Sequence, residues 1–275
     1  MRPDPFSACE ALVRNADYDR YLAALFVPAE RRAHMFALFA FNYEVAKTAE
    51  TVTQPMMGQM RLQWWRDALD EIAAGHVRRH DVVEAMAETL AAHQLPRAVL
   101  DGLIDAREND LLEAPFETWK EFDAYADATA GNVMRLAARI VGVEDAVDAA
   151  AHHAGIAYAL TGLLRALPFH ARARRLMLPL EALRAAGISQ EQIFSGIMDD
   201  KVTALIGAAA ARAREHFGAA KTLRPRAGIP AFLPASLVPL YLKRLMRPGF
   251  PPFSDSTDVP VFRRQLAMLA ATLGR

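Results

Sequence analysis

The sequence predicts an all-α fold. Apolar residues recur at spacings of three, four and seven along two neighbouring stretches, which is the period of amphipathic helices. No stretch shows the alternating apolar and polar pattern of a half-buried β-strand, and no glycine-rich phosphate loop occurs. Thr53-Gln54-Pro55 separates the two stretches. Their apolar positions are Met35, Leu38, Val45, Ala49 and Val52 in the first, and Met57, Met60, Trp64, Ala68 and Ile72 in the second.

Start and stop signals delimit further helices in order along the chain. Pro28 lies near the first turn of the helix that carries the first stretch. After a turn over residues 75–79, Asp81 and Glu84 form a pattern of the capping-box type that starts the next helix. Pro96 ends that helix and begins another.

The second half of the chain continues in the same way. Thr118 with Glu121, and Ser189 with Gln192, have the spacing of capping boxes that begin helices. Gly142 ends a helix, as glycine commonly does. The other helices are expected at residues 146–167, 202–221 and 261–273. Residues 229–234 lead into a stretch marked by Leu237, Leu240, Tyr241 and Leu245, which is expected to be the last core helix rather than a membrane-facing one.

Composition limits the class of protein. The chain has 275 residues, 53% of them hydrophobic, and a formal net charge of zero, which indicates one globular domain. This charge balance argues against nucleic-acid binding, which normally needs a basic surface. The single cysteine, Cys9, excludes an internal disulfide and fits a reducing compartment.

Membrane and targeting signals are weak. Residues 1–22 contain acids and prolines and lack the apolar core of a secretory signal or the composition of a transit peptide. The longest mostly apolar run, residues 229–242, is shorter than a membrane span and contains three prolines. We therefore expect a soluble protein or one that lies on a membrane surface.

Several motifs resemble those of the squalene/phytoene synthase family, in the family's order. ALFAFNYEV at residues 37–45 and RLQWWRDAL at residues 61–69 are similar to the family's A-L-Y-A-F-C-R-x-x-D-D-x-x-D and R-L-x-W-W-R helices. F-x-T-W-x-E at residues 116–121 and Y-x-x-x-x-A-G-x-V at residues 125–133 also match. The resemblance covers about residues 18–242. It implies a single-domain isoprenoid-synthase-like helical bundle around a central cavity, with an N-terminal extension (1–17) and a C-terminal loop and short helix (249–275).

The first aspartate-rich motif of this family is altered here. Family members use two D-x-x-x-D pairs on facing helices to hold Mg²⁺ against the diphosphates of prenyl substrates. Residues four apart on a helix lie on one face, so each pair directs two carboxylates at one point. At the first motif Ala46 supplies no ligand, Lys47 adds a charge that repels a metal ion, and only Glu50 remains.

The second motif is altered in the same way. Residues 158–179 are similar to the family's Q-L-T-N-I-L-R-D-x-x-E-D and R-G-R-I-Y-L-P segments, but the two outer aspartates correspond to Ala166 and His170. Because the aspartates are missing from both motifs, we expect a cleft that does not bind Mg²⁺, and therefore no cofactor. His152, His153 and His170 lack the spacing of a zinc site.

Other residues are candidates for a ligand site or a substitute metal site. Glu50, Asp105 and Asp110 are the acids left for a metal, although Asp105 and Asp110 are expected to pair with arginines. Trp64 is expected to be a core residue. The candidate cavity and ligand residues are Tyr43, Arg61, Trp65, Tyr125, Gly131, Asn132 and Arg165.

Three functions remain open. Residues 41–44, 60–65 and 164–170 resemble R-A-F-N-x-E, M-R-x-Q-x-W and L-R-A-x-P-x-H of the family branch that assembles mitochondrial respiratory complex I. That resemblance implies a non-catalytic helper with complex I components or another membrane protein as partner, and an isoprenoid or lipid as ligand. Since no transit peptide is recognised, the expected location is the bacterial cytoplasm, peripheral to the inner face of the membrane. The alternatives are a Mg²⁺-dependent prenyl transferase that condenses two prenyl diphosphates, and a structural protein that binds only a protein partner.

Overall fold

The structure is a computed structural model that describes residues 4–112, 114–144, 146–247, 249–253 and 259–274. Within these ranges the chain forms helices and connecting turns and no β-strand, so the all-α prediction is confirmed. The chain divides into two compact units, which are described separately. The first unit comprises Met1–Leu112, Asn132–Asp148 and Pro225–Phe232, and the second comprises Glu113–Gly131, Ala149–Arg224 and Leu233–Arg275. The single-domain organisation and the central cavity stay predictions.

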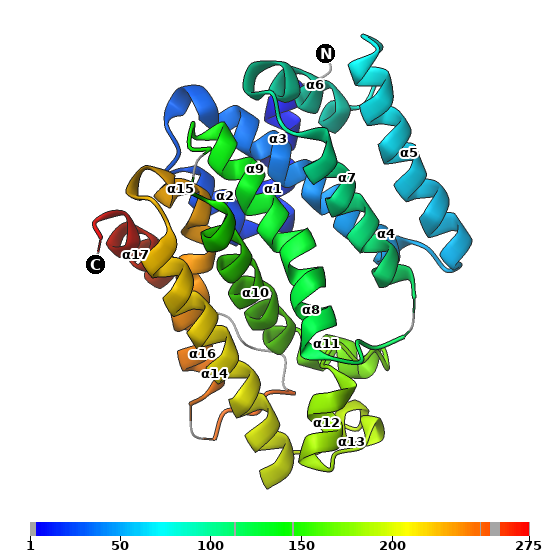
Figure 1. Ribbon diagram of the computed structural model, residues 1–275, viewed down its shortest axis with the longest axis vertical. Helices are drawn as coiled ribbons and strands as arrows, with labels where there is room; N and C mark the ends of the chain where they lie inside the picture. Colours follow the sequence, from blue (N-terminus) through cyan, green and yellow to red (C-terminus); the bar gives the residue numbers. More distant parts are fainter. Residues whose placement is uncertain (1–3, 113, 145, 248, 254–258, 275) are drawn as a thin grey trace. The chain divides into compact units, whose positions relative to one another are not determined.

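The first unit is built from the N-terminal helices and two later segments of the chain (Figure 1). Its α-helices are α1 (Pro5–Ala16), α2 (Tyr18–Ala24), α3 (Ala29–Ala46), α4 (Thr48–Thr51), α5 (Pro55–Ala73), α6 (Asp81–His93), α7 (Arg97–Ala106), α9 (Asn132–Ile140) and α15 (Ile229–Phe232). Two 3₁₀ turns, η1 (Arg107–Leu111) and η3 (Arg226–Gly228), complete it.

Helix α3 is the centre of the first unit. Residues Met35 to Phe41 are all buried, so this part of the helix is apolar on every side, as expected of a helix surrounded by others. It packs against α1, α6 and α9. Helix α1, capped where the Asp4 carboxylate accepts a hydrogen bond from the Ser7 amide, buries Cys9 and Val13 in the same core. Residues 5–16 therefore contribute to the core of the first unit. Because Cys9 is buried there, the pKa of its thiol is raised to about 12.

The first predicted helix ends earlier than expected. Helix α3 stops at Ala46, and Thr48–Thr51 form the separate short helix α4, where continuous helix was predicted to Val52. Threonine hydroxyls take part in this break, because the Thr48 Oγ1 donates to the Glu44 carbonyl at 3.5 Å and the Thr51 Oγ1 donates to the Lys47 carbonyl at 3.2 Å. Such side-chain bonds offer the backbone an alternative to a regular helix.

The buried face of α5 was predicted incorrectly. The predicted stripe included Met57, Met60 and Trp64, but Met57 and Met60 are exposed. The close contact is centred on Gly58 instead, where an added Cβ would lie 2.3 Å from Leu111 Cδ2. This close contact fixes the rotation of the helix. Its buried residues are Gly58, Leu62, Trp65, Ala68 and Leu69.

The second unit contains the remaining helices. They are α8 (Trp119–Ala126), α10 (Asp148–Arg165, in this unit from Ala149), α11 (Leu167–Arg172), α12 (Leu180–Ala186), α13 (Gln190–Phe194), α14 (Asp200–Leu223), α16 (Val238–Leu245) and α17 (Val261–Thr272). A π-helical turn, η2 (Asp127–Gly131), follows α8, and a 3₁₀ turn, η4 (Leu233–Leu237), precedes α16.

Apolar side chains of α10, α14 and α16 form the core of this second unit. Leu160 and Leu164 on α10, Ile206 on α14 and Leu242 on α16 belong to one buried cluster. The prediction that the stretch from Leu237 to Leu245 is a core helix is confirmed by α16, which buries Val238, Tyr241, Leu242 and Leu245. The Ser189–Gln192 capping box is present, and Thr118 accepts a hydrogen bond from the Glu121 amide as its pattern predicts.

Among the described residues, no helix combines the length and the apolar character needed to cross a membrane.

Candidate functional site

The first altered motif surrounds a buried carboxylate with two cations. The Lys47 Nζ donates to Glu44 Oε1, and Arg61 Nη2 lies 3.6 Å from Glu44 Oε2. The Lys47 ammonium also lies 4.9 Å from the centre of the Tyr43 ring. Three candidates from the sequence, Tyr43, Lys47 and Arg61, are thus brought together. Glu44, the residue that connects them, was missed, although its i,i+3 spacing to Lys47 is the signal that identifies such a pair.

The other two positions of this motif lie apart from the ion pair. Ala46 is the last residue of α3, and Glu50 is exposed on α4. Arg61 reaches α4 as well, because its Nη1 donates to the Thr51 hydroxyl at 3.2 Å. The arginine therefore fixes α5 to both helices that carry the altered motif.

Replacing Lys47 with methionine is expected to lower the free energy of unfolding by about 1–2 kcal/mol. Methionine keeps most of the side-chain length but leaves the buried Glu44 carboxylate with Arg61 alone. Urea denaturation measures the change. The control is Lys120→Met on the exposed face of α8, for which we expect a change within about 0.5 kcal/mol. Equal stability of the two variants would contradict the proposed role of Lys47.

Asp105 and Asp110, two of the acids considered as substitute metal ligands, pair with arginines. Arg66 Nη2 lies 2.5 Å from Asp105 Oδ1 and 2.7 Å from Glu108 Oε1. Arg107 Nη1 lies 3.0 Å from Asp110 Oδ2. The prediction that arginines neutralise Asp105 and Asp110 is confirmed. In the part of the chain that the structure describes, no three His, Cys, Asp or Glu side chains are grouped so that they could hold a metal ion.

Trp65 is a core residue, and its predicted part in a ligand cavity stays a prediction. Its ring is buried and packs edge-to-face on Phe41 and Trp64, with centroid distances of 5.4 and 4.9 Å. Trp64, which was expected in the core, is only half-buried. The guanidinium carbon of Arg78 lies 5.0 Å from the centre of its ring. The structure buries Trp65 where the sequence analysis placed Trp64 in the core, because the buried face of α5 was predicted incorrectly.

The second altered motif keeps its helical geometry. The His170 amide donates to the Ala166 carbonyl at 2.9 Å, so positions 166 and 170 are separated by one helical turn. Their side chains are a methyl group and an imidazole. Pro168 lies in the first turn of α11, which starts after α10 ends at Arg165. The Arg165 guanidinium stacks on Tyr241 of α16, 3.6 Å from the ring centre.

The A-G-x-V segment at residues 130–133 takes part in close packing between helices. Gly131 lies against Gly155 of α10, where an added Cβ at position 155 would be 2.5 Å from the Gly131 nitrogen. The Tyr125 ring lies 5.2 Å from that of Phe116 in the same unit. In the first unit, Asn132 Nδ2 donates to the Val99 carbonyl at 3.3 Å, which connects α9 to α7. These predicted ligand residues therefore all make packing contacts.

A histidine cluster in the second unit was not predicted. His153 Nδ1 on α10 lies 3.0 Å from His216 Nδ1 on α14, so one of the two rings carries the hydrogen that joins them. His152 Nδ1 lies 3.3 Å from Asp127 Oδ2. Burial, and then the neighbouring His152, lower the pKa of His153 below its ordinary value of 6.5. Burial also lowers the pKa of His216, while Asp123 acts in the opposite direction.

Stability is expected to fall as the pH drops below about 6.5. A histidine with a lowered folded-state pKa binds its proton more readily in the unfolded chain, so its stabilising effect is complete above the unfolded pKa and is lost below it. The urea midpoint between pH 7.5 and pH 5 checks this. His216→Gln should flatten the slope, whereas His76→Gln, at an exposed histidine, should retain it. A midpoint independent of pH would contradict the expectation.

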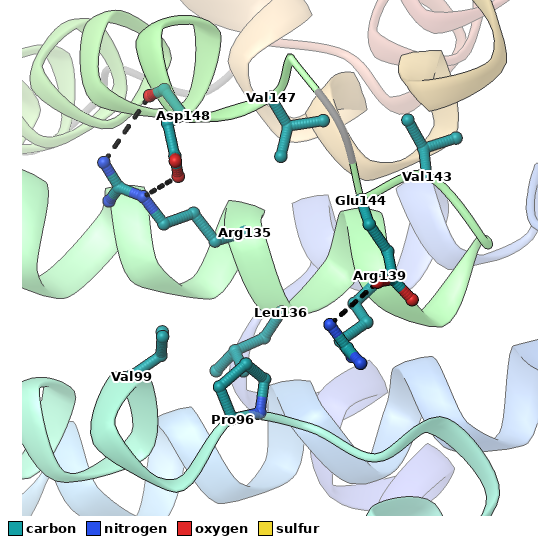
Figure 2. A pocket seen from close by; sticks show the side chains of 9 residues that line it. All are labelled: Pro96, Val99, Arg135, Leu136, Arg139, Val143, Glu144, Val147 and Asp148. Atoms are coloured by element: carbon teal, nitrogen blue, oxygen red, sulfur yellow. Dashed lines mark hydrogen bonds and ion pairs between the residues drawn. The ribbon is translucent and has the colours of Figure 1, made fainter.

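The first unit has a small surface pocket along α9 (Figure 2). Its volume is about 120 Å³, well below the roughly 300–1,000 Å³ typical of small-molecule sites. Two ion pairs border it: Arg135 Nε donates to Asp148 Oδ1 at 3.0 Å, and Arg139 Nη1 donates to Glu144 Oε2 at 3.0 Å. The pocket has room for only a few atoms. Its apolar lining consists of Pro96, Val99, Leu136, Val143 and Val147.

Helical architecture and motif order together define an isoprenoid-synthase-like protein. The structure is similar to a dehydrosqualene synthase crystallised with ligand (TM-score 0.85, 17% identity, 98% of this chain and 95% of that one). It is also similar to squalene synthase HpnC from Alicyclobacillus acidocaldarius (TM-score 0.80, 22% identity, 90% and 95%). At these identities the likeness shows the fold alone. The sequence profile of the squalene/phytoene synthase family matches residues 13–265, and the chain belongs to this family.

Curated relatives fall into two groups. The chain is 32% identical over 252 residues to NADH dehydrogenase (ubiquinone) complex I, assembly factor 6, of Bos taurus and of Homo sapiens, covering 90% of this chain and 76% of each relative. It is 26% identical over 294 residues to 15-cis-phytoene synthase of Synechococcus elongatus, covering 98% and 94%. The more distant group consists of synthases, and the nearer one consists of assembly factors, as the sequence motifs predicted.

Proposed function

We propose that this chain is a non-catalytic member of the squalene/phytoene synthase family that assists the assembly of a respiratory complex of the complex I type. The observation that carries the proposal is the pairing of Glu44 with both Lys47 and Arg61. A carboxylate that already neutralises two cations is a poor ligand for Mg²⁺, which requires several oxygen donors free to bind it. The names of the relatives that are 32% identical support the assembly role.

The residues at the second motif support the same proposal. Ala166 has no donor, and the imidazole of His170 offers nitrogen where Mg²⁺ prefers oxygen. Asp105 and Asp110, which would have to replace the missing ligands, are paired with Arg66 and Arg107. The side chains therefore do not fit the Mg²⁺ that a prenyl transferase needs.

Deletion of the gene tests the assembly role. We expect the deletion to reduce the amount of fully assembled complex I in membranes, measured on native gels, and the wild-type gene to restore it. A gene that encodes Glu50→Gln together with Asp105→Asn, two exposed acids, should restore it equally well. Unchanged complex I in the deletion strain would contradict the assembly role. Failure of the folded double variant to complement would contradict the non-catalytic role.

A lipid or isoprenoid ligand is the second part of the proposal. It rests on the family resemblance alone. Organic extraction of the purified protein followed by mass spectrometry should recover such a molecule in a fixed ratio to protein. Recovery no greater than from an unrelated helical protein purified in parallel would contradict it, and would favour a scaffold that binds only a protein partner.

A further inference from the structure

Helix α17 has an unpaired apolar stripe opposite the face that attaches it to the protein. Met268 and Ala271 are buried, and the helix packs on η4 of the same unit (Figure 1). Four large apolar side chains are exposed at spacings of four, three and four, which places them on one side of the helix. They are Phe262, Leu266, Leu269 and Leu273, exposed by 58%, 58%, 45% and 67%.

Charge beside the stripe is positive. Helix α17 contains two arginines and no acid. Arg263 is exposed at the edge of the stripe, with its guanidinium 5.9 Å from the centre of the Phe262 ring. Although the whole chain is neutral, residues 243–275 contain six basic and two acidic residues. An anionic surface is therefore the complementary partner for this part of the protein.

The stripe is a narrow row of apolar side chains on one short helix. Its four half-exposed side chains provide roughly 400 Å² of apolar surface, within the ~300–600 Å² of the largest, often functional, patch on a typical monomer. A lipid surface needs no matching shape, because its binding strength increases with the apolar area inserted and with attraction to anionic head groups. With 12 residues, α17 is about 18 Å long, short of the ~30 Å hydrocarbon core, so it would lie along the membrane plane.

We infer that α17 is a docking surface for anionic membranes, with the stripe Phe262, Leu266, Leu269 and Leu273 inserted among the lipids and Arg263 directed at phosphate groups. Long basic side chains at a membrane boundary place their charge at the head groups while their stems remain apolar. This inference stands apart from the proposed assembly role, since it rests only on the exposed side chains of the second unit.

Flotation with lipid vesicles tests the inference on the full-length protein. The wild type should float with vesicles of equal parts phosphatidylcholine and phosphatidylglycerol, and at least tenfold less with phosphatidylcholine alone. Leu266→Gln/Leu269→Gln should abolish flotation, and Arg263→Gln should weaken binding about fivefold at low salt. The matched control is Met56→Gln/Met60→Gln on α5, which changes two apolar residues that are more exposed than the leucines (69% and 68%) and should leave flotation unchanged.

Three results would overturn the inference. The first is a wild type that stays in solution with anionic vesicles. The second is a Leu266→Gln/Leu269→Gln variant that floats as well as the wild type. The third is a wild type that light scattering shows to be a dimer and that Leu266→Gln/Leu269→Gln converts to a monomer, which would make the stripe an interface between copies. Circular dichroism of every variant establishes that the helices are intact.

Discussion

Replacing Trp65 with alanine is expected to lower the free energy of unfolding by about 3–5 kcal/mol. The ring is buried, packs on Phe41 of α3, and contacts His80 at a centroid distance of 5.5 Å, so its removal leaves a cavity between α5 and the centre of the first unit. The cost combines the lost burial of the indole with the cavity left behind. Urea denaturation at neutral pH measures it.

Trp64→Ala is the matched control because it removes the same side chain one position along the helix. Trp64 is half-buried, and we expect a loss of about 1–2 kcal/mol, part of it from the lost contact with the Arg78 guanidinium. A larger loss for Trp64 than for Trp65 would mean that the buried face of α5 is the one predicted from the sequence and not the one observed.

Gly155→Ala is expected to destabilise the second unit by about 1–3 kcal/mol, although alanine normally stabilises a helix relative to glycine. The added Cβ would lie 2.5 Å from the Gly131 nitrogen and 2.7 Å from its Cα. Both are backbone atoms, which cannot move aside as the end of a flexible side chain can. Helix α10 and η2 would therefore have to separate.

Gly162→Ala on the same helix is expected to change the free energy of unfolding in the opposite direction. Apart from the backbone of its own helix and its chain neighbours, no atom lies within 4 Å of a Cβ built there, so alanine should raise the free energy of unfolding by up to about 1 kcal/mol. The two substitutions differ only in what surrounds them, and opposite signs in thermal or urea denaturation would confirm the close contact at Gly155. A stabilising Gly155→Ala would show that α10 and η2 are farther apart than described.

Local signals in the sequence were sufficient for the fold class and for most helix ends. The helix expected at residues 202–221 corresponds to α14, and the one expected at residues 261–273 corresponds to α17. These succeed because periodicity, caps and prolines act within a few residues of the backbone that they direct. The rotation of α5 was not predictable in the same way, because it depends on Gly58 fitting against Leu111, which is distant in sequence.

The candidate site shows the same division. The sequence identified Lys47 and Arg61 as candidate site residues and predicted that Asp105 and Asp110 pair with arginines. These features could be predicted because charge and helical spacing can be read directly from the sequence. It did not identify Glu44 as the common partner of two cations, since Arg61 reaches it from another helix. The contact of His153 with His216 likewise joins two helices whose register only packing determines.

We propose that this chain keeps the fold of its family while its altered motifs no longer serve metal chemistry. Small residues at Gly131 and Gly155 still bring two backbones together, and Arg165 still meets an aromatic ring on α16. At the first motif, by contrast, the Glu44 carboxylate is already paired with Lys47 and Arg61. We propose that the retained fold serves binding and assembly.

The most direct test of this central claim is turnover. The purified, folded protein is incubated with Mg²⁺ and farnesyl or geranylgeranyl diphosphate, released diphosphate is assayed, and the organic extract is examined by mass spectrometry. A catalytically competent squalene or phytoene synthase assayed in parallel serves as the positive control. We predict no Mg²⁺-dependent diphosphate release above the protein-free reaction. Release of diphosphate together with a condensed hydrocarbon would contradict the account.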